Sequence, residues 1–187
     1  MKIEIIYLFR HYNPFNDASS RMRRKKESSS SDAPMQVFNY TDHVITSAWI
    51  NGEWAGRSRT NENGGTTCCV KIPDTYHPGI TMTVTWERNA CISSNKECYE
   101  KYGKKDLDFP QIKLQKTITL PPYDTKEVSE LQIAFLPNDE VRVYADNRGF
   151  ERLDHPSVAE FGNLLQDGPR PLEKLWVNIT GKQGASN

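Results

Sequence analysis

The stretch from Asn39 to Trp86 decides the fold, and it reads NYTDHVITSAWINGEWAGRSRTNENGGTTCCVKIPDTYHPGITMTVTW. Before the Asn51-Gly52 dipeptide, polarity alternates with a period of two, as in a strand with one buried face. Asn51 and Gly52 both tolerate the positive φ that a tight hairpin needs. We therefore predict a β-hairpin with Trp54 on the returning strand. Its first strand has two faces: Val44, Thr46, Ala48 and Ile50 on one, and His43, Ile45, Ser47 and Trp49 on the other.

Turn signals divide the rest of the chain at short intervals. Asn63-Gly64-Gly65 predicts a turn before a strand at Thr66–Pro73, and His77-Pro78-Gly79 predicts one before Ile80–Trp86. Further strands are expected at 112–120, 131–136, 141–144 and 172–179, the second and third of these forming a hairpin. The fold class is therefore mainly β: an antiparallel β-sandwich or strongly curved sheet of about seven or eight strands with one short helix.

The short helix is predicted at Ser157–Gln166, where apolar residues recur at helical spacing. Ser157 or Asp154 is the candidate N-cap residue.

The amino end differs in composition from this domain. Met1–Tyr12 is apolar but too short to span a bilayer, and five basic residues within Arg21–Lys26 precede the serines Ser28–Ser31. A secretory signal places its charge before the apolar stretch, so no intact signal is recognised. We expect a disordered or vector-derived leader at 1–34, a single β-rich domain at 35–181 and a flexible tail at 182–187. A native first strand is the alternative for the leader.

The overall charge does not favour a nucleic-acid partner. The 24 basic residues balance 24 acidic ones, which leaves a formal net charge of zero. Binding to nucleic acid draws most of its affinity from an excess of basic side chains on phosphate.

The four cysteines bear on the compartment. Cys91 and Cys98 stand in the polar segment ACISSNKEC, at a spacing unlike structural zinc sites. An even count in a β-rich domain suits an oxidising compartment, where a Cys91–Cys98 disulfide would fasten this loop. Adjacent Cys68 and Cys69 are expected to point to opposite faces, Cys68 inward and Cys69 outward, and so not to bond each other easily. Four reduced cysteines are the alternative.

No catalytic constellation is recognised. The chain has no nucleophile elbow, zincin motif or phosphate-binding glycine loop, and the four histidines lie far apart in the sequence. The acidic pairs Asp106/Asp108 and Asp139/Glu140 are read as solvated loops. We therefore predict a protein that is not an enzyme, with no catalytic residues, no metal and no cofactor.

Exposed aromatic residues give a better indication, because binding surfaces concentrate Trp and Tyr. Trp49 and Trp54 flank the hairpin turn, and a polar tip follows at Asn61–Asn63. Polar tips held on a rigid sheet are frequent recognition sites; the alternative is that one of the two Trp residues belongs to the core. The candidate partner-binding residues are Trp49, Asn51, Glu53, Trp54, Asn61, Glu62 and Asn63.

Several blocks carry a family resemblance. They are NYTD at 39–42, WINGEWAG at 49–56, GG followed by CCVKIP up to Pro73, HPG at 77–79 and VTW at 84–86, together with LPPY at 120–123 and FLPN at 135–138. Over residues 37–147 the chain resembles a family of small bacterial lipoproteins of unknown function. That family is similar to the immunity proteins encoded beside type VI secretion phospholipase effectors.

The resemblance implies stoichiometric inhibition of a toxic lipase. The module would cover the active site or lid of the cognate effector in the periplasm, as a lipoprotein of the inner or outer membrane. A lipid-anchoring cysteine after an apolar signal is not found here, so membrane contact through an anchor cannot be read from this chain. No small-molecule substrate is expected. The alternatives are an envelope domain that binds glycan and, less favoured, a small hydrolase.

Overall fold

The structure, a computed structural model, describes residues 29–92, 95–103, 109–124, 126, 128–170, 172 and 176. Eight strands and two short helices make up its regular elements. In chain order these are β1 (Ser30–Asn39), β2 (Ile45–Ile50), β3 (Glu53–Ser58), β4 (Asn63–Pro73), β5 (Thr81–Asn89), α1 (Lys96–Tyr102), β6 (Gln111–Thr119), β7 (Glu130–Leu136), β8 (Glu140–Asp146) and α2 (Ser157–Phe161). The prediction of a mainly β fold is confirmed, and β1 begins inside the range that the sequence assigned to a leader.

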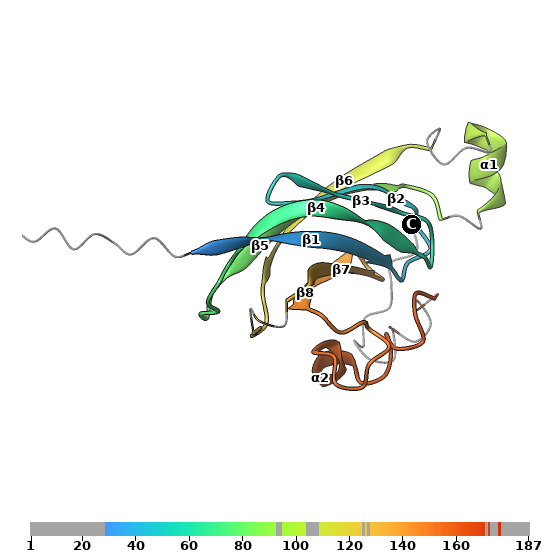
Figure 1. Cartoon of the computed structure of the whole chain (residues 1–187). Coiled ribbons are helices and arrows are strands. Elements are labelled where there is room, and N and C mark those ends of the chain that lie inside the picture. The colour runs from blue at the N-terminus through green and yellow to red at the C-terminus, as the bar shows by residue number, and fades with distance from the viewer. Residues whose placement is uncertain are drawn as a thin grey trace, which may run out of the picture.

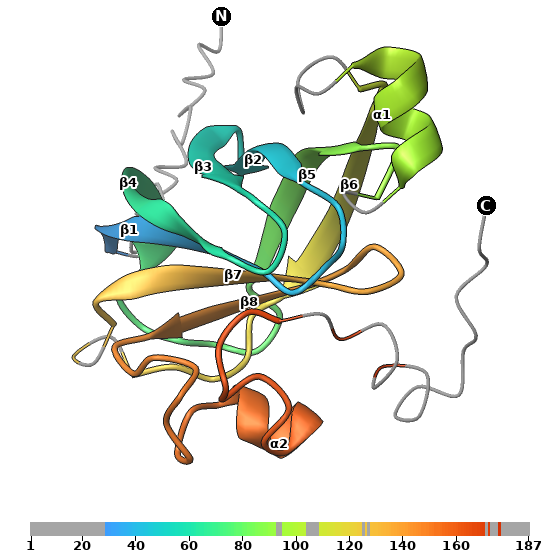
Figure 2. The same ribbon diagram turned by 90° about the vertical axis from the view of Figure 1, so that its right-hand side faces the viewer.

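The strands form two four-stranded sheets (Figure 1). The first has the order β4-β1-β7-β8 and the second the order β3-β2-β5-β6. All neighbours pair antiparallel except β1 and β7, which are parallel. Figure 2 shows the second sheet above β7 and β8, with α2 on the far side of the first sheet.

The main core lies between the two sheets. Inward side chains of β1, β7 and β8 meet those of β2 and β5, and Trp86 packs on Phe135 with ring centroids 5.6 Å apart. Trp86 is 1 % exposed. Burying side chains of this size supplies most of the driving force for folding.

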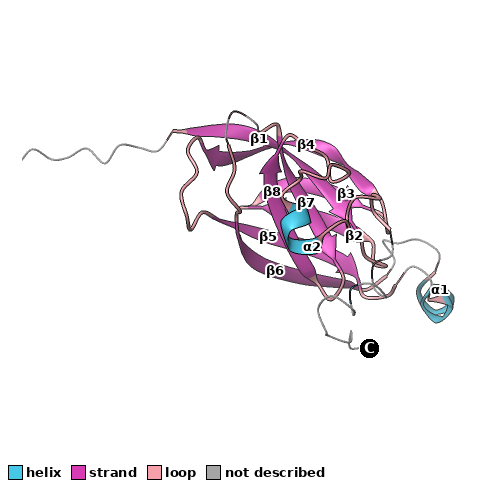
Figure 3. Ribbon diagram, turned by 90° about the horizontal axis from the view of Figure 1, so that it is seen from below, coloured by secondary structure: helices cyan, strands magenta, loops and turns pink. Residues whose placement is uncertain are grey.

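A second core lies on the other face of the first sheet. Phe161 of α2 and the more C-terminal Leu165, Leu172 and Trp176 cover Phe38 of β1 and side chains of β7 and β8. Figure 3 shows α2 lying over β7 and β8. With both of its faces covered, β7 is buried from Leu131 to Leu136. The part of the first sheet around β7 and β8 is therefore covered on both faces, whereas no described element covers the outer face of the second sheet.

Besides those at the adjacent cysteines, described below, two local predictions in the deciding stretch were wrong. The pairing register shifts between Ile45 and Ala48, a β-bulge, so that Ile45 joins Ala48 and Ile50 in the core. Strict alternation had placed Ile45 on the opposite face, but a bulge adds a residue and reverses the alternation.

The second wrong prediction is the turn at Asn63-Gly64-Gly65, because these residues begin β4. The turn falls earlier, around Asn61, which has a φ of 54°. Gly64 is needed for close backbone approach, since a Cβ there would lie 2.5 Å from the carbonyl oxygen of Arg57.

Helical structure also differs from the prediction. The helix α2 ends at Phe161, before Gly162, and its N-cap residue Pro156 provides no side-chain cap. The polar segment around Cys98 contains α1, whose N-terminus is capped by the side chain of Asn95. The predicted strand at 172–179 lies largely outside the described residues; the Trp176 amide donates to the carbonyl of Leu172, a spacing typical of a helix.

Candidate functional site: the open face of the second sheet

The outer face of the sheet β3-β2-β5-β6, called the open face below, presents polar and aromatic side chains. Along β5, Met82, Val84 and Trp86 are buried, so the residues between them point outward. Thr83 and Thr85 are among these outward residues and are partly exposed. The alternation that fills the core on one side therefore builds a polar surface on the other.

The pairing register aligns one row of side chains across all four strands. Trp54 of β3 pairs with Trp49 of β2, Trp49 pairs with Thr85 of β5, and Thr85 pairs with Gln115 of β6. The Thr85 hydroxyl donates to the Gln115 side-chain oxygen over 3.3 Å. Trp54 is 50 % exposed, and Trp49 is partly buried. Two indole rings and two hydrogen-bonding side chains thus form a continuous strip on a rigid sheet.

A charged pair borders this strip. Lys113 of β6 pairs in register with Glu87 of β5, and the ammonium nitrogen lies 3.5 Å from the Glu87 carboxylate. The same nitrogen lies 5.5 Å from the centroid of the Trp49 ring, within cation–π range. The contact restrains the indole of Trp49 in the plane of the open face.

The hairpin turn holds the end of the strip in place. Asn51 and Gly52 have φ values of 50° and 90°, as the sequence predicted for a tight hairpin. The Asn51 amide donates to the carbonyl of Thr83 over 2.8 Å, and its side-chain oxygen accepts from the Thr83 amide over 2.9 Å. Asn51 therefore fixes the turn onto β5, while Glu53 stays exposed beside Trp54.

The structure does not bring all the predicted binding residues together. Trp49, Asn51, Glu53 and Trp54 meet at the β2–β3 hairpin. Asn61, Glu62 and Asn63 lie at the turn between β3 and β4, at the other end of β3. The predicted residues therefore form two separate surfaces.

The cysteines form two disulfides. One joins Cys91 to Cys98, the pair expected from the loop spacing, and α1 begins inside the loop that it closes. The other joins the neighbours Cys68 and Cys69, and the peptide bond between these two residues is cis. The expectation that these two would not bond each other was wrong, as was the inward placement of Cys68, which is exposed.

The ladder between β1 and β4 explains why alternation fails at Cys68 and Cys69. Ala33 pairs with Val70 and Met35 with Thr67, so both cysteines stand opposite the single residue Pro34. Two residues against one make a bulge, and a proline has no amide hydrogen to give to the ladder.

A serine–histidine pair occurs in the second core. The Ser157 hydroxyl lies 2.7 Å from His155 Nδ1, and His155 Nε2 lies 2.8 Å from the side-chain oxygen of Gln132. Burial lowers the pKa of His155 from 6.5 to about 4, so the ring is neutral at pH 7. Both of its nitrogens are hydrogen-bonded. His155 is 2 % and Ser157 1 % exposed. This arrangement joins α2 to the sheet and leaves no room for a substrate.

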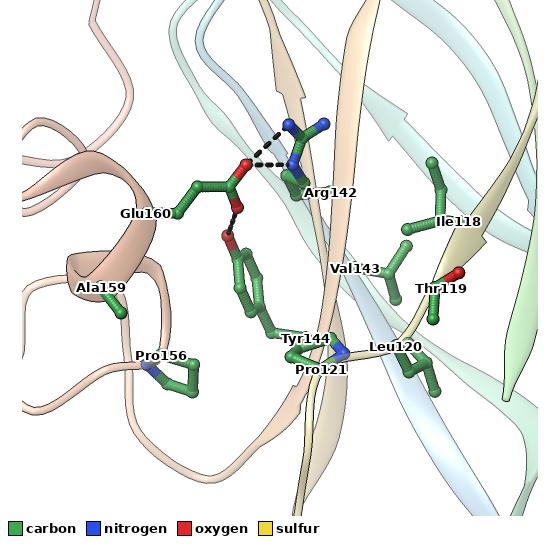
Figure 4. Close-up of a pocket in the computed structure, with 10 residues that line it drawn as sticks. All are labelled: Ile118, Thr119, Leu120, Pro121, Arg142, Val143, Tyr144, Pro156, Ala159 and Glu160. Atoms are coloured by element: carbon green, nitrogen blue, oxygen red, sulfur yellow. Dashed lines mark hydrogen bonds and ion pairs between the residues drawn. The ribbon is translucent and has the colours of Figure 1, made fainter. Parts of the chain in front are cut away.

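A cleft of about 550 Å³ separates the end of β6 and β8 from α2. Figure 4 shows Arg142 and Tyr144 both directed to the carboxylate of Glu160. The Arg142 guanidinium lies 2.6 Å from that carboxylate, and the Tyr144 hydroxyl donates to it over 3.3 Å. These polar groups satisfy one another, so the cleft offers a ligand mainly apolar walls.

Among the described residues, no group of three or more His, Cys, Asp or Glu side chains is placed to hold a metal ion. No helix in the described ranges is both long enough and apolar enough to cross a bilayer.

Sequence reasoning missed Thr85, Lys113 and Gln115 as members of the open face. The signal was present, because the predicted strand at 112–120 places Lys113 and Gln115 opposite its apolar positions. What the sequence did not provide was the strand order, which sets β6 beside β5 and both beside the tryptophans.

The model of a protein family described as "Protein of unknown function (DUF3304)" matches residues 38–143 of the chain. This range spans β2 to β7 in full, and with them every strand of the open face. No curated protein and no solved structure matches the chain.

Proposed function

We propose that this chain, which belongs to the DUF3304 family of proteins of unknown function, is a protein-binding module that neutralises a partner by covering it. The observation that carries the proposal is the row Trp54, Trp49, Thr85 and Gln115 across four paired strands. Protein interfaces are enriched in Trp at their desolvated centres and have a polar rim. The open face has this composition.

Rigidity supports the same function. A face built on paired strands, with the hairpin turn hydrogen-bonded to β5 and Trp49 held against Lys113, loses little conformational freedom on binding. A preorganised surface of this kind suits tight one-to-one inhibition, because little conformational entropy is lost when the partner binds.

The proposed partner is a secreted lipase of the type VI secretion system, as the family resemblance implies. The two disulfides suit an oxidising compartment such as the periplasm. There the module would bind the lipase over its active site or lid and keep it from the membrane of the producing cell. We propose attachment as a lipoprotein for the native protein.

Co-expression with the lipase encoded beside it tests the proposal. We expect the two proteins to co-purify in a one-to-one complex and the lipase to lose its activity in proportion to the amount of complex. Absence of a complex at micromolar concentrations, with both proteins folded, would contradict the proposed function.

Glycan binding is the second candidate, favoured by the same strip of residues. A half-exposed indole beside hydroxyl and amide side chains also provides a surface on which a sugar ring stacks. A glycan array distinguishes the two functions: specific glycan binding that Trp54→Ala abolishes, together with no lipase complex, would favour the glycan.

A further inference from the structure

A second cavity lies away from the open face strip, where the β3–β4 turn meets the start of β2. Its volume is about 510 Å³, and its lining includes Thr46, Arg57, Arg59, Glu62, Gly64 and Gly65. We infer that this cavity, called the arginine cavity below, binds the phosphate group of an amine-bearing phosphate ester. The inference does not rest on the proposed function.

Two unneutralised cations line the arginine cavity. Arg57 and Arg59 are exposed and stand two residues apart in an extended segment, which places them on the same side. Within the described part of the chain neither forms an ion pair. By contrast, each of five other arginines is paired with a carboxylate: Arg88, Arg142, Arg148, Arg152 and Arg170.

The backbone that carries these arginines is held from the buried side. The Ser58 side chain, 4 % exposed, donates to the carbonyl of Glu62 over 2.7 Å. The Asn39 side chain, fully buried, donates to the carbonyl of Arg59 over 2.9 Å. The turn is therefore fixed before any ligand arrives, which reduces the entropic cost of binding.

Part of the lining is the glycine backbone at Gly65. A Cβ added at Gly65 would meet no atom within 4 Å, so open space lies next to its backbone. A wall without side chains allows a ligand to approach the main chain closely. Together the two arginines and the glycines form a cationic site with room for a tetrahedral group.

The number of donors favours phosphate over carboxylate. A carboxylate has two oxygens in one plane, whereas a phosphate monoester has three unesterified oxygens in a tetrahedral arrangement, which two guanidinium groups can contact from different sides. Glu62 places one carboxylate in the same lining. A ligand that carries an amine near its phosphate satisfies Arg57, Arg59 and Glu62 at once, and phosphoethanolamine is the simplest such molecule.

Isothermal titration calorimetry with O-phosphoethanolamine, inorganic phosphate and acetate tests this assignment. We expect the affinity to fall in that order. The double variant Arg57→Gln/Arg59→Gln should bind O-phosphoethanolamine at least tenfold more weakly, and Glu62→Gln should lose the preference for it over inorganic phosphate. Arg152→Gln, which removes an exposed arginine far along the chain, is the matched control and should leave binding unchanged.

Sedimentation with vesicles distinguishes the source of the phosphate. Binding to vesicles of phosphatidylethanolamine but not of phosphatidylglycerol would identify a lipid headgroup, and binding to the soluble ester alone would identify a free metabolite. Both results support the site. Three results would overturn it. The first is acetate binding as tightly as the phosphate ester, and the second is an equal loss of affinity in the double variant and in Arg152→Gln. The third is an NMR titration of the unaltered protein in which the Gly64 and Gly65 amide signals do not shift.

Discussion

Gly64 illustrates how one missing side chain permits a contact between sheets. It lies in β4, where its Cα approaches both β3 and β1: an added Cβ would lie 2.5 Å from the Arg57 carbonyl oxygen and 3.3 Å from the Val37 Cβ. The nearest atom belongs to the backbone of β3, which cannot move aside as the end of a flexible side chain could. The edges of the two sheets meet here, so the position bears on the whole sandwich.

We expect Gly64→Ala to lower the free energy of unfolding by about 2–3 kcal/mol because the new methyl group overpacks the junction. Gly65→Ala is the control, since its Cβ enters open space; its effect should stay below about 1 kcal/mol. Urea denaturation of both variants makes the comparison. Equal losses would show that the β3–β4 junction is not the cause.

His155 gives the protein a defined pH dependence. Burial lowers the pKa of its ring to about 4 from 6.5, so between these values the unfolded chain binds a proton that the folded one does not. The free energy of unfolding should therefore fall as the pH drops from about 6.5 to 4 and level off for this group below 4. The contribution is on the order of 3 kcal/mol.

Urea denaturation across pH 4 to 7 measures this loss, and comparison with His155→Gln isolates it from His43, whose pKa is also lowered by burial. NMR titration of the His155 ring in the unaltered protein provides a check that needs no variant. A ring pKa near 6.5 in the folded protein would contradict the prediction.

Among single residues, the hairpin turn at Asn51-Gly52 and the place of Trp54 on its returning strand could be predicted, because turn chemistry and alternation act locally. Cys68 and Ile45 could not, since each lies at a bulge that only the partner strand defines. Alternation determines which face a side chain takes only while the ladder is regular.

At the scale of elements, a bidentate ion pair connects the two sheets. Arg88 at the end of β5 binds Asp139, in the turn between β7 and β8, through two hydrogen bonds of 2.6 and 2.8 Å. The Arg88 side chain is only 14 % exposed. A bidentate pair that is largely shielded from water contributes more than an exposed one.

Asp139→Asn should lower the free energy of unfolding by about 1–2 kcal/mol, because it removes the charge while an asparagine still tolerates the φ of 57° at this position. Asp154→Asn removes a carboxylate whose side chain is 55 % exposed and should cost clearly less than Asp139→Asn, because water screens an exposed ion pair. Thermal unfolding of the two variants side by side tests the difference, and a larger loss for Asp154→Asn would refute it.

The disulfide at Cys91–Cys98 acts on one element. The helix α1 has no buried residue of its own, so the covalent link and the capping residue Asn95 restrain it more than packing does. In Cys91→Ser/Cys98→Ser we expect hydrogen exchange in α1 to quicken at least tenfold while β5 and β6 keep their protection. Faster exchange throughout the sheet would mean that the loop supports the whole domain.

At the scale of the whole molecule, the layers decide which surface is available. The first sheet lies between the main core and the second core, and its β7 is buried on both faces. Among the elements that the structure describes, none covers the outer face of the second sheet, so only its inner face is buried. The sequence predicted β2 to β8 and the mainly β class, because both follow from local periodicity, but it did not predict β1, which begins in the range assigned to a leader. It did not predict this layering, because a sheet order and a parallel β1–β7 pair arise from contacts between distant segments.

The proposed role of the open face in binding can be tested by calorimetry with the proposed lipase partner. Trp49→Ala should weaken binding at least tenfold, because it removes the indole at the centre of the strip. Leu153→Ala, which removes a side chain 72 % exposed in the loop before α2, should change the affinity less than twofold. If instead Leu153→Ala weakens binding tenfold and Trp49→Ala does not, the partner binds the opposite side of the molecule and the account is contradicted.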